Sequence, residues 1–95
     1  MNDELFEWDD ANLLHIAEHD VLPEEAEEVL LGEPMELDFD QASGEDRWTY
    51  VGETTAGRVL TVVFTQRGRH MRIVTAFIPS PLRMRLYRQW RAQQS

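Results

Sequence analysis

The segment His15-Ile16-Ala17-Glu18-His19 carries the clearest chemical pattern in the chain, with two histidines four residues apart and a glutamate beside the second. On a helix, residues i and i+4 share a face, so His15 and His19 would reach one metal ion. Glu18 would then act as general base on a metal-bound water, as in the zinc hydrolases that carry the H-x-x-E-H pattern.

Such a zinc site also needs a third protein ligand from a separate element, and the segment does not supply one. A short pattern with three fixed positions arises readily by chance in helices. The simpler interpretation is structural: Asn12, His15 and His19 lie on one partly exposed face and bond to a sheet or to each other. We therefore expect no metal and keep zinc hydrolysis by His15, Glu18 and His19 as a distant alternative.

Charge is divided sharply along the chain. Residues 1–46 carry 17 acids and no base, whereas residues 47–95 carry one acid and nine bases, all of them arginine. The two halves therefore have charges of −17 and +8, which sum to −9. One interpretation is that the two halves fold onto each other and that their opposite charges neutralise one another. The other is that the arginines form a face that binds phosphate or carboxylate groups, although the net charge opposes strong non-specific binding of nucleic acid.

Several classes of protein are excluded by composition. The chain has no cysteine, which rules out disulfides and thiolate chemistry, and its three serines lie outside any nucleophile motif. The acidic N-terminus lacks the features of a signal peptide, and no apolar run is long enough to span a bilayer. The sequence thus predicts a cytoplasmic protein without a membrane partner, folded as a single domain over residues 1–95.

The pattern of apolar residues predicts an α+β fold. Two N-terminal helices precede an antiparallel β-meander, because the connections between the strands are too short for crossover helices. An amphipathic helix rich in arginine ends the chain. Trp8, Trp48, Phe64 and Phe77 are expected in the core. The predicted elements are an edge strand at 5–8, helices at 9–20 and 22–34, strands at 35–40, 47–54, 58–66 and 72–78, and a helix at 80–94.

Five short stretches and one tyrosine, in this order, resemble the BrnT family of bacterial toxins over about residues 6–90. The stretches are FEWD at 6–9, EHDV at 18–21, PEEAEEVL at 23–30, GRVLTVVFTQRG at 57–68 and RIVTA at 72–76, followed by Tyr87 in the last helix.

The resemblance implies a RelE-like ribonuclease fold and a metal-independent endoribonuclease from a type II toxin–antitoxin pair. It implies no cofactor, an RNA substrate, an antitoxin as partner, and a homodimer as one assembly. The positions that match the family assign catalysis to His19, Arg58, Arg72 and Tyr87. Arg83 and Arg85 are expected to bind RNA. For Arg58 and Arg72 the structural interpretation is that they are exposed strand residues or that they pair with the glutamates of the second helix.

Three charged positions depart from the family pattern. Glu18 stands where the family has lysine, Phe77 stands where it commonly has arginine, and Arg83-Met84 replaces its Glu-Arg pair. Cations stabilise the charge that develops on a reacting phosphate, so these changes predict weakened cleavage. The alternative is a non-catalytic module of the same fold that binds protein or nucleic acid.

Overall fold

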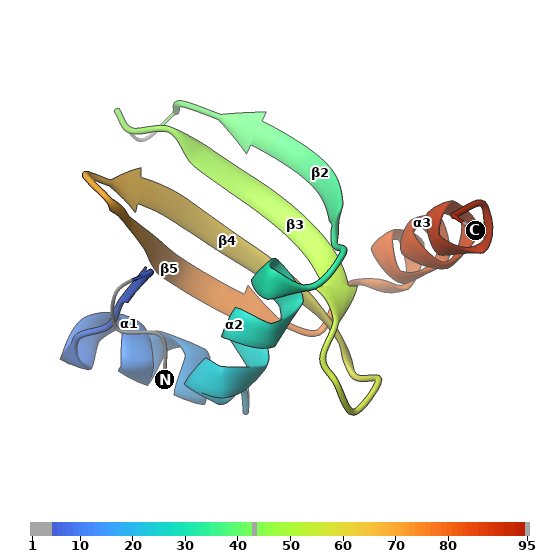
Figure 1. Cartoon of the computed structure of the whole chain (residues 1–95), viewed down its shortest axis with the longest axis horizontal. Helices are drawn as coiled ribbons and strands as arrows, with labels where there is room; N and C mark the ends of the chain where they lie inside the picture. The colour runs from blue at the N-terminus through green and yellow to red at the C-terminus, as the bar shows by residue number, and fades with distance from the viewer. Residues whose placement is uncertain (1–4, 43, 95) are drawn as a thin grey trace.

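The computed structural model describes residues 5–42 and 44–94 and has the predicted α+β architecture (Figure 1). In chain order the elements are β1 (Phe6–Glu7), α1 (Asp10–Ala17), α2 (Pro23–Leu31), β2 (Met35–Asp40), β3 (Arg47–Glu53), β4 (Val59–Arg67), β5 (His70–Phe77) and α3 (Pro81–Ala92). No helix in the described part of the chain is long and apolar enough to cross a membrane.

Local chemistry explains where α1 and α2 begin. The carboxylate of Asp9 accepts from the backbone of Asn12, and the side chain of Asn12 accepts from the backbone of Asp9, which forms a capping box. Pro23 occupies the first turn of α2, where its fixed φ and missing N–H suit a helix start. α1 is shorter than expected, because it ends at Ala17 and the chain reverses through Asp20 at a positive φ of 57°.

The strands form one sheet in the order β1-β5-β4-β3-β2. β2 to β5 are antiparallel neighbours, which confirms the predicted meander. β1 is the expected edge strand but runs parallel to β5, so the sheet as a whole is mixed. Gly57 and Gly68 take positive φ values in the turns on either side of β4, a conformation that favours glycine.

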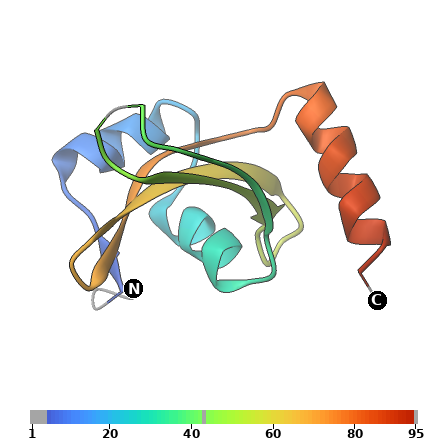
Figure 2. The same ribbon diagram turned by 90° about the horizontal axis from the view of Figure 1, so that it is seen from above.

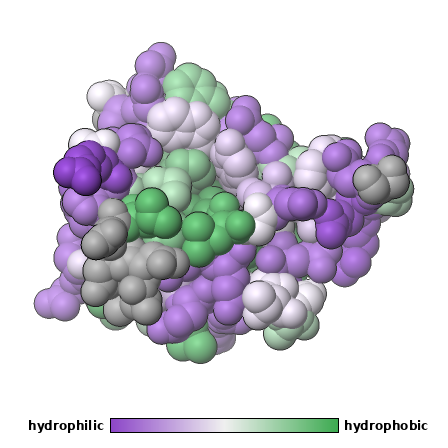
Figure 3. Space-filling view, in the orientation of Figure 1, coloured by the Kyte–Doolittle hydropathy of each residue, from purple (hydrophilic) through white to green (hydrophobic). Residues whose placement is uncertain are grey.

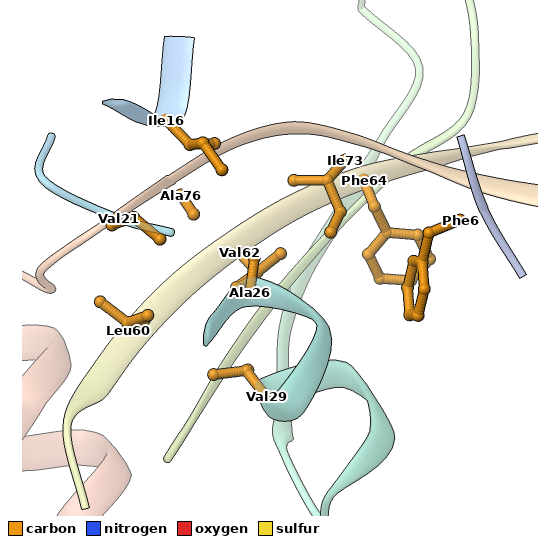
Figure 4. Close-up of a cluster of buried hydrophobic side chains, with 10 residues drawn as sticks. All are labelled: Phe6, Ile16, Val21, Ala26, Val29, Leu60, Val62, Phe64, Ile73 and Ala76. Atoms are coloured by element: carbon orange, nitrogen blue, oxygen red, sulfur yellow. The ribbon is translucent and has the colours of Figure 1, made fainter. Parts of the chain in front are cut away.

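The main core lies between one face of the sheet and α2, and Ile16 of α1 reaches it from beside β5. Figure 4 shows the ten buried side chains of this cluster, which come from β1, α1, α2, β4, β5 and the turn between the two helices. Phe64 belongs to it, and Trp8 and Trp48 pack against it as partly buried residues. Phe77 is outside both core clusters and is only half-buried, so its predicted place in the core is wrong.

α3 covers only one end of the opposite face of the sheet. Its Tyr87 is buried with Met35, Val51 and Val59 in a second, smaller cluster. The side chain of Ser80 caps the helix by accepting from the backbone of Arg83. Seen from above, α3 stands at the end of the sheet, joined to it by the segment that follows β5 (Figure 2).

The acidic and basic halves do pair within the fold. Each ion pair among the described residues joins an acid of residues 1–46 to an arginine of residues 47–95, which supports the first interpretation of the charge pattern. The pairs are Arg58–Glu25, Arg67–Glu7, Arg72–Glu7, Arg72–Asp9 and Arg91–Glu33.

Candidate functional site

A cavity of about 210 Å³ opens where α1 meets the three central strands, and we call it the arginine cavity. Three arginines and one histidine face it from four elements, together with one carboxylate from the loop before β3. Its lining residues are Ala11, Asn12, His15, Glu45, Arg47, Thr65, Arg67, Arg72 and Val74.

Strand register brings two of these arginines together. Arg47 of β3 pairs with Thr65 of β4, and Thr65 pairs with Arg72 of β5, so the three residues form one row across the sheet. Side chains alternate along a strand, and Phe64 points into the main core, so this row lies on the other face. Arg67, two residues after Thr65, shares that face. Thr65 is buried and donates to the carbonyl of Asp46 at 2.7 Å.

Asn12 fixes α1 against the edge of β5. Its amide donates to the carbonyls of Glu7 at 2.9 Å and of Ile73 at 3.0 Å, and the residue is 2% exposed. This confirms that Asn12 bonds to the sheet, although it is buried rather than partly exposed. Residues three apart on a helix share a face. Asn12 therefore orients His15, one turn later, towards the cavity that both residues line.

Carboxylates from the N-terminal segment occupy Arg72. The Arg72 guanidinium donates to both oxygens of Asp9, at 2.7 and 3.1 Å, and to Glu7 at 3.1 Å. The bond from Arg72 and the backbone N–H of Asn12 hold the pKa of Asp9 below its ordinary value, and the bond to Asp9 raises the pKa of Arg72. Glu7 also lies 3.6 Å from Arg67.

Arg47 differs from its two neighbours in the arginine cavity. Its Nε is buried and has no hydrogen-bond partner among the described residues, and none of the ion pairs found there involves it. An unpaired buried donor is costly unless another group binds it. Arg47 is therefore the one arginine of the cavity whose charge has no carboxylate partner among the described residues.

His19 and Arg58 lie together at the other end of the sheet. Arg58 donates to the carboxylate of Glu25, at 2.9 and 3.1 Å, and to the carbonyl of Asp20. This contact with α2 matches the structural interpretation of Arg58. The backbone N–H of Leu22 and, after it, Arg58 keep the pKa of Glu25 below its ordinary value. The ring of His19 lies 5.8 Å from that of Phe77.

Tyr87 is separate from both groups. It is 2% exposed and its hydroxyl donates to Glu53 at 3.1 Å. Burial, followed by the bond to Glu53, raises its pKa. Tyr87, Glu53, Thr54, Glu33 and Arg91 line a second cavity of about 320 Å³.

The two arginines predicted to bind RNA lie on α3. Arg83 is half-buried and Arg85 is exposed, and neither lines the arginine cavity. Of the four predicted catalytic residues, only Arg72 lines it. The sequence prediction did not include Glu45, Arg47 or Arg67, and it considered His15 only in the zinc alternative. Arg47 and Arg67 lie at the ends of strands. This position identifies them as cavity residues only when the register between the strands is known.

The helical premise of the zinc pattern is wrong. α1 ends at Ala17, Glu18 is its C-cap, and His19 lies in the turn beyond. In the part of the chain that the structure describes, no group of three or more His, Cys, Asp or Glu residues is arranged to hold a metal ion.

Comparison with known protein families identifies the family of this chain. Residues 8–77, well over half of its length, match the model of the family described as ribonuclease toxin, BrnT, of type II toxin–antitoxin system. No curated protein and no solved structure matches the chain. The match includes every residue of the arginine cavity and excludes α3. The chain therefore belongs to the BrnT family of type II toxin–antitoxin ribonuclease toxins.

Proposed function

We propose that this chain is a metal-independent endoribonuclease of a toxin–antitoxin pair, that it cleaves RNA at the arginine cavity, and that its activity is weak. The observation that carries the proposal is the convergence of Arg47, Arg67, Arg72 and His15 on one cavity. Cytoplasmic location and an antitoxin partner belong to the same proposal, since the substrate would be cellular RNA.

The arginine cavity contains the groups that RNA cleavage requires. A base removes the proton of a ribose 2′-hydroxyl, and that oxygen attacks the adjacent phosphorus. The bond from phosphorus to the 5′-oxygen breaks, an acid protonates the leaving oxygen, and a 2′,3′-cyclic phosphate remains. His15 and Glu45 supply an acid–base pair in the cavity. The guanidinium groups stabilise the additional negative charge on the phosphoryl oxygens.

Weak activity follows from the acids beside the cavity. Glu7 and Asp9 already bind Arg72, and Glu7 is close to Arg67. A phosphate must therefore compete with two carboxylates for Arg72, and of the three arginines of the cavity only Arg47 is without an acidic partner among the described residues. The same observation favours a second candidate, a module of this fold that binds RNA or protein without cleaving, because a neutralised site retains little power to stabilise a transition state.

The experiment compares wild type, Arg47→Ala and Arg69→Ala on bulk RNA with EDTA present. Arg69 is an exposed arginine in the β4–β5 turn and does not line the cavity, so it is the matched control. One cationic contact to a transition state contributes a few kcal/mol, so Arg47→Ala should lower kcat/KM about 100-fold while Arg69→Ala leaves it nearly unchanged.

The other outcomes are equally informative. RNA that is bound but not cleaved by wild type would support the binding module. Cleavage that survives Arg47→Ala would refute the arginine cavity as the site. If wild type neither binds nor cleaves RNA, the ribonuclease proposal is refuted.

A further inference from the structure

α3 has two different faces. Tyr87, Met84 and Trp90 form the inner face, which packs on the second core cluster. Leu82, Arg85, Leu86 and Gln89 lie on the opposite side of the helix, and Arg88 lies at one flank. We call these five residues the outer face of α3. Leu82 is 60% exposed and Leu86 is 42% exposed.

Three of the four arginines of α3 have no ion-pair partner among the residues that the structure describes. The helix has four arginines and no acid, in a chain with 18 acids and nine bases. Among residues 5–42 and 44–94, the single ion pair of α3 joins Arg91 to Glu33 at 3.5 Å, between two exposed side chains. Arg58, Arg67 and Arg72 each have an acidic partner in the same fold. Hydrophilic residues dominate the visible surface of α3 (Figure 3).

The spacing of Leu82 and Leu86 defines the shape of a ligand. Residues i and i+4 form one ridge on a helix, and such a ridge packs between side chains of a second helix. Exposed Arg85, three residues after Leu82 and therefore beside that ridge, favours a carboxylate on the other side of the contact. We propose that the outer face of α3 docks a partner protein through a helix that carries apolar residues at i and i+4 flanked by Asp or Glu.

RNA fits this face less well than such a helix. The two leucines cannot form hydrogen bonds with a base or a phosphate. Contact with a polyanion would also not stabilise their exposed apolar side chains. The net charge of −9 also repels a long polyanion more strongly than a short acidic helix. A contact limited to one face of a 12-residue helix is at the small end of specific interfaces, so we expect micromolar affinity.

This inference is independent of catalysis, because the outer face of α3 shares no residue with the arginine cavity. The test uses the full chain and three synthetic helical peptides of equal length. The first has leucines at i and i+4 flanked by glutamates. In the second those leucines are serines, and in the third the glutamates are lysines. Binding is measured by fluorescence anisotropy and mapped by backbone amide shifts.

The first peptide should bind with amide shifts concentrated in α3, and the other two should bind at least about tenfold more weakly. Leu86→Ser in the protein should weaken binding of the first peptide about tenfold. Leu14→Ser, at a 63% exposed position on α1, should leave it unchanged. Thermal unfolding of both variants should match wild type, because both side chains are exposed.

Three results would overturn the proposal. The first is no binding of the glutamate–leucine peptide at millimolar concentration. The second is equal binding to wild type and Leu86→Ser. The third is binding of an RNA oligonucleotide or of anionic phospholipid vesicles that Leu86→Ser and Arg85→Ala abolish while peptide binding persists, since α3 would then serve a different class of ligand.

Discussion

The guanidinium of Arg72 binds both carboxylate oxygens of Asp9, at 2.7 and 3.1 Å, and so joins β5 to the residue that caps α1. Asp9 therefore has two roles, since it accepts the backbone N–H of Asn12 as well. Arg72 is 13% exposed at its side chain, which makes this the best shielded arginine among the ion pairs of the described residues. The contact ties the acidic half of the chain to the basic half at the edge of the arginine cavity.

Acidification should destabilise the fold through Asp9 and Glu25. Both carboxyl groups have a lowered pKa in the folded state, relative to ordinary values of 3.8 and 4.5. At acid pH the unfolded chain therefore binds more protons than the folded chain. The stability that these groups contribute is complete above their ordinary pKa values and is lost as the pH falls through the lowered ones.

Denaturant unfolding from pH 7 to pH 3 measures this dependence. The double variant Asp9→Asn with Glu25→Gln should show a shallower fall in the free energy of unfolding across the carboxylate range. The control replaces Glu24, an exposed acid of α2 without an ion pair in the described structure. Identical slopes for wild type and the double variant would show that these two carboxylates do not govern acid stability.

Glu7→Gln should increase the affinity of the arginine cavity for RNA. The substitution removes the charge that lies 3.1 Å from Arg72 and 3.6 Å from Arg67. The side chain of Glu7 is 37% exposed, and exposed ion pairs contribute about 0.2–1 kcal/mol each, so the loss of two pairs should raise the affinity by a factor between about 2 and about 30. An oligonucleotide binding titration measures it, with Glu24→Gln as the matched control. Equal affinities for wild type and Glu7→Gln would mean that Glu7 does not compete with phosphate.

The departures from the family pattern at Glu18 and Phe77 test where the site lies. Both residues flank His19, at the end of β5 opposite Arg72, and neither lines the arginine cavity. Glu18→Lys with Phe77→Arg should therefore leave RNA cleavage nearly unchanged, whereas the family pattern alone predicts that this double change raises cleavage. A large rise in kcat/KM, together with no effect of Arg47→Ala, would move the active site to His19 and Arg58.

The elements of this fold are readable from the sequence because apolar periodicity and turn residues are local signals. Pro23 and Ser80, for example, mark helix starts that the structure confirms. The end of α1 is harder to predict from the sequence, because apolar Ile16 continues the helical pattern. The turn that follows ends at Asp20, which has a positive φ. The parallel pairing of Phe6 with Met71 joins residues distant in sequence and has no local signal.

The arginine cavity depends on strand register, which explains why sequence reasoning named only Arg72 among its three arginines. Arg47 and Arg72 become neighbours because Thr65 pairs with both, and a shift of one residue would place one of them on the other face. Arg58 was predicted for catalysis by resemblance, yet Glu25 occupies its guanidinium. The structural interpretation of this residue, a partner for the acidic second helix, was available from composition.

Asn12→Ala should destabilise the fold more than any exposed substitution discussed above. The buried Asn12 amide donates to the carbonyls of Glu7 and Ile73, and its oxygen accepts from the backbone of Asp9. Alanine removes the capping box and leaves the carbonyl of Ile73 buried without this donor. Each lost bond costs about 0.5–1.5 kcal/mol, so the free energy of unfolding should fall by about 2–4 kcal/mol.

Urea unfolding measures this loss, with Gln89→Ala on the exposed side of α3 as the matched amide control. Because Asn12 also fixes the turn of α1 that presents His15, RNA cleavage by the folded fraction should fall as well. His15→Ala separates the two effects, since His15 is exposed and its loss should lower cleavage with little change in stability. If Asn12→Ala unfolds like wild type, the amide bonds to β1 and β5 do not hold α1 on the sheet, and the positioning of His15 needs another explanation.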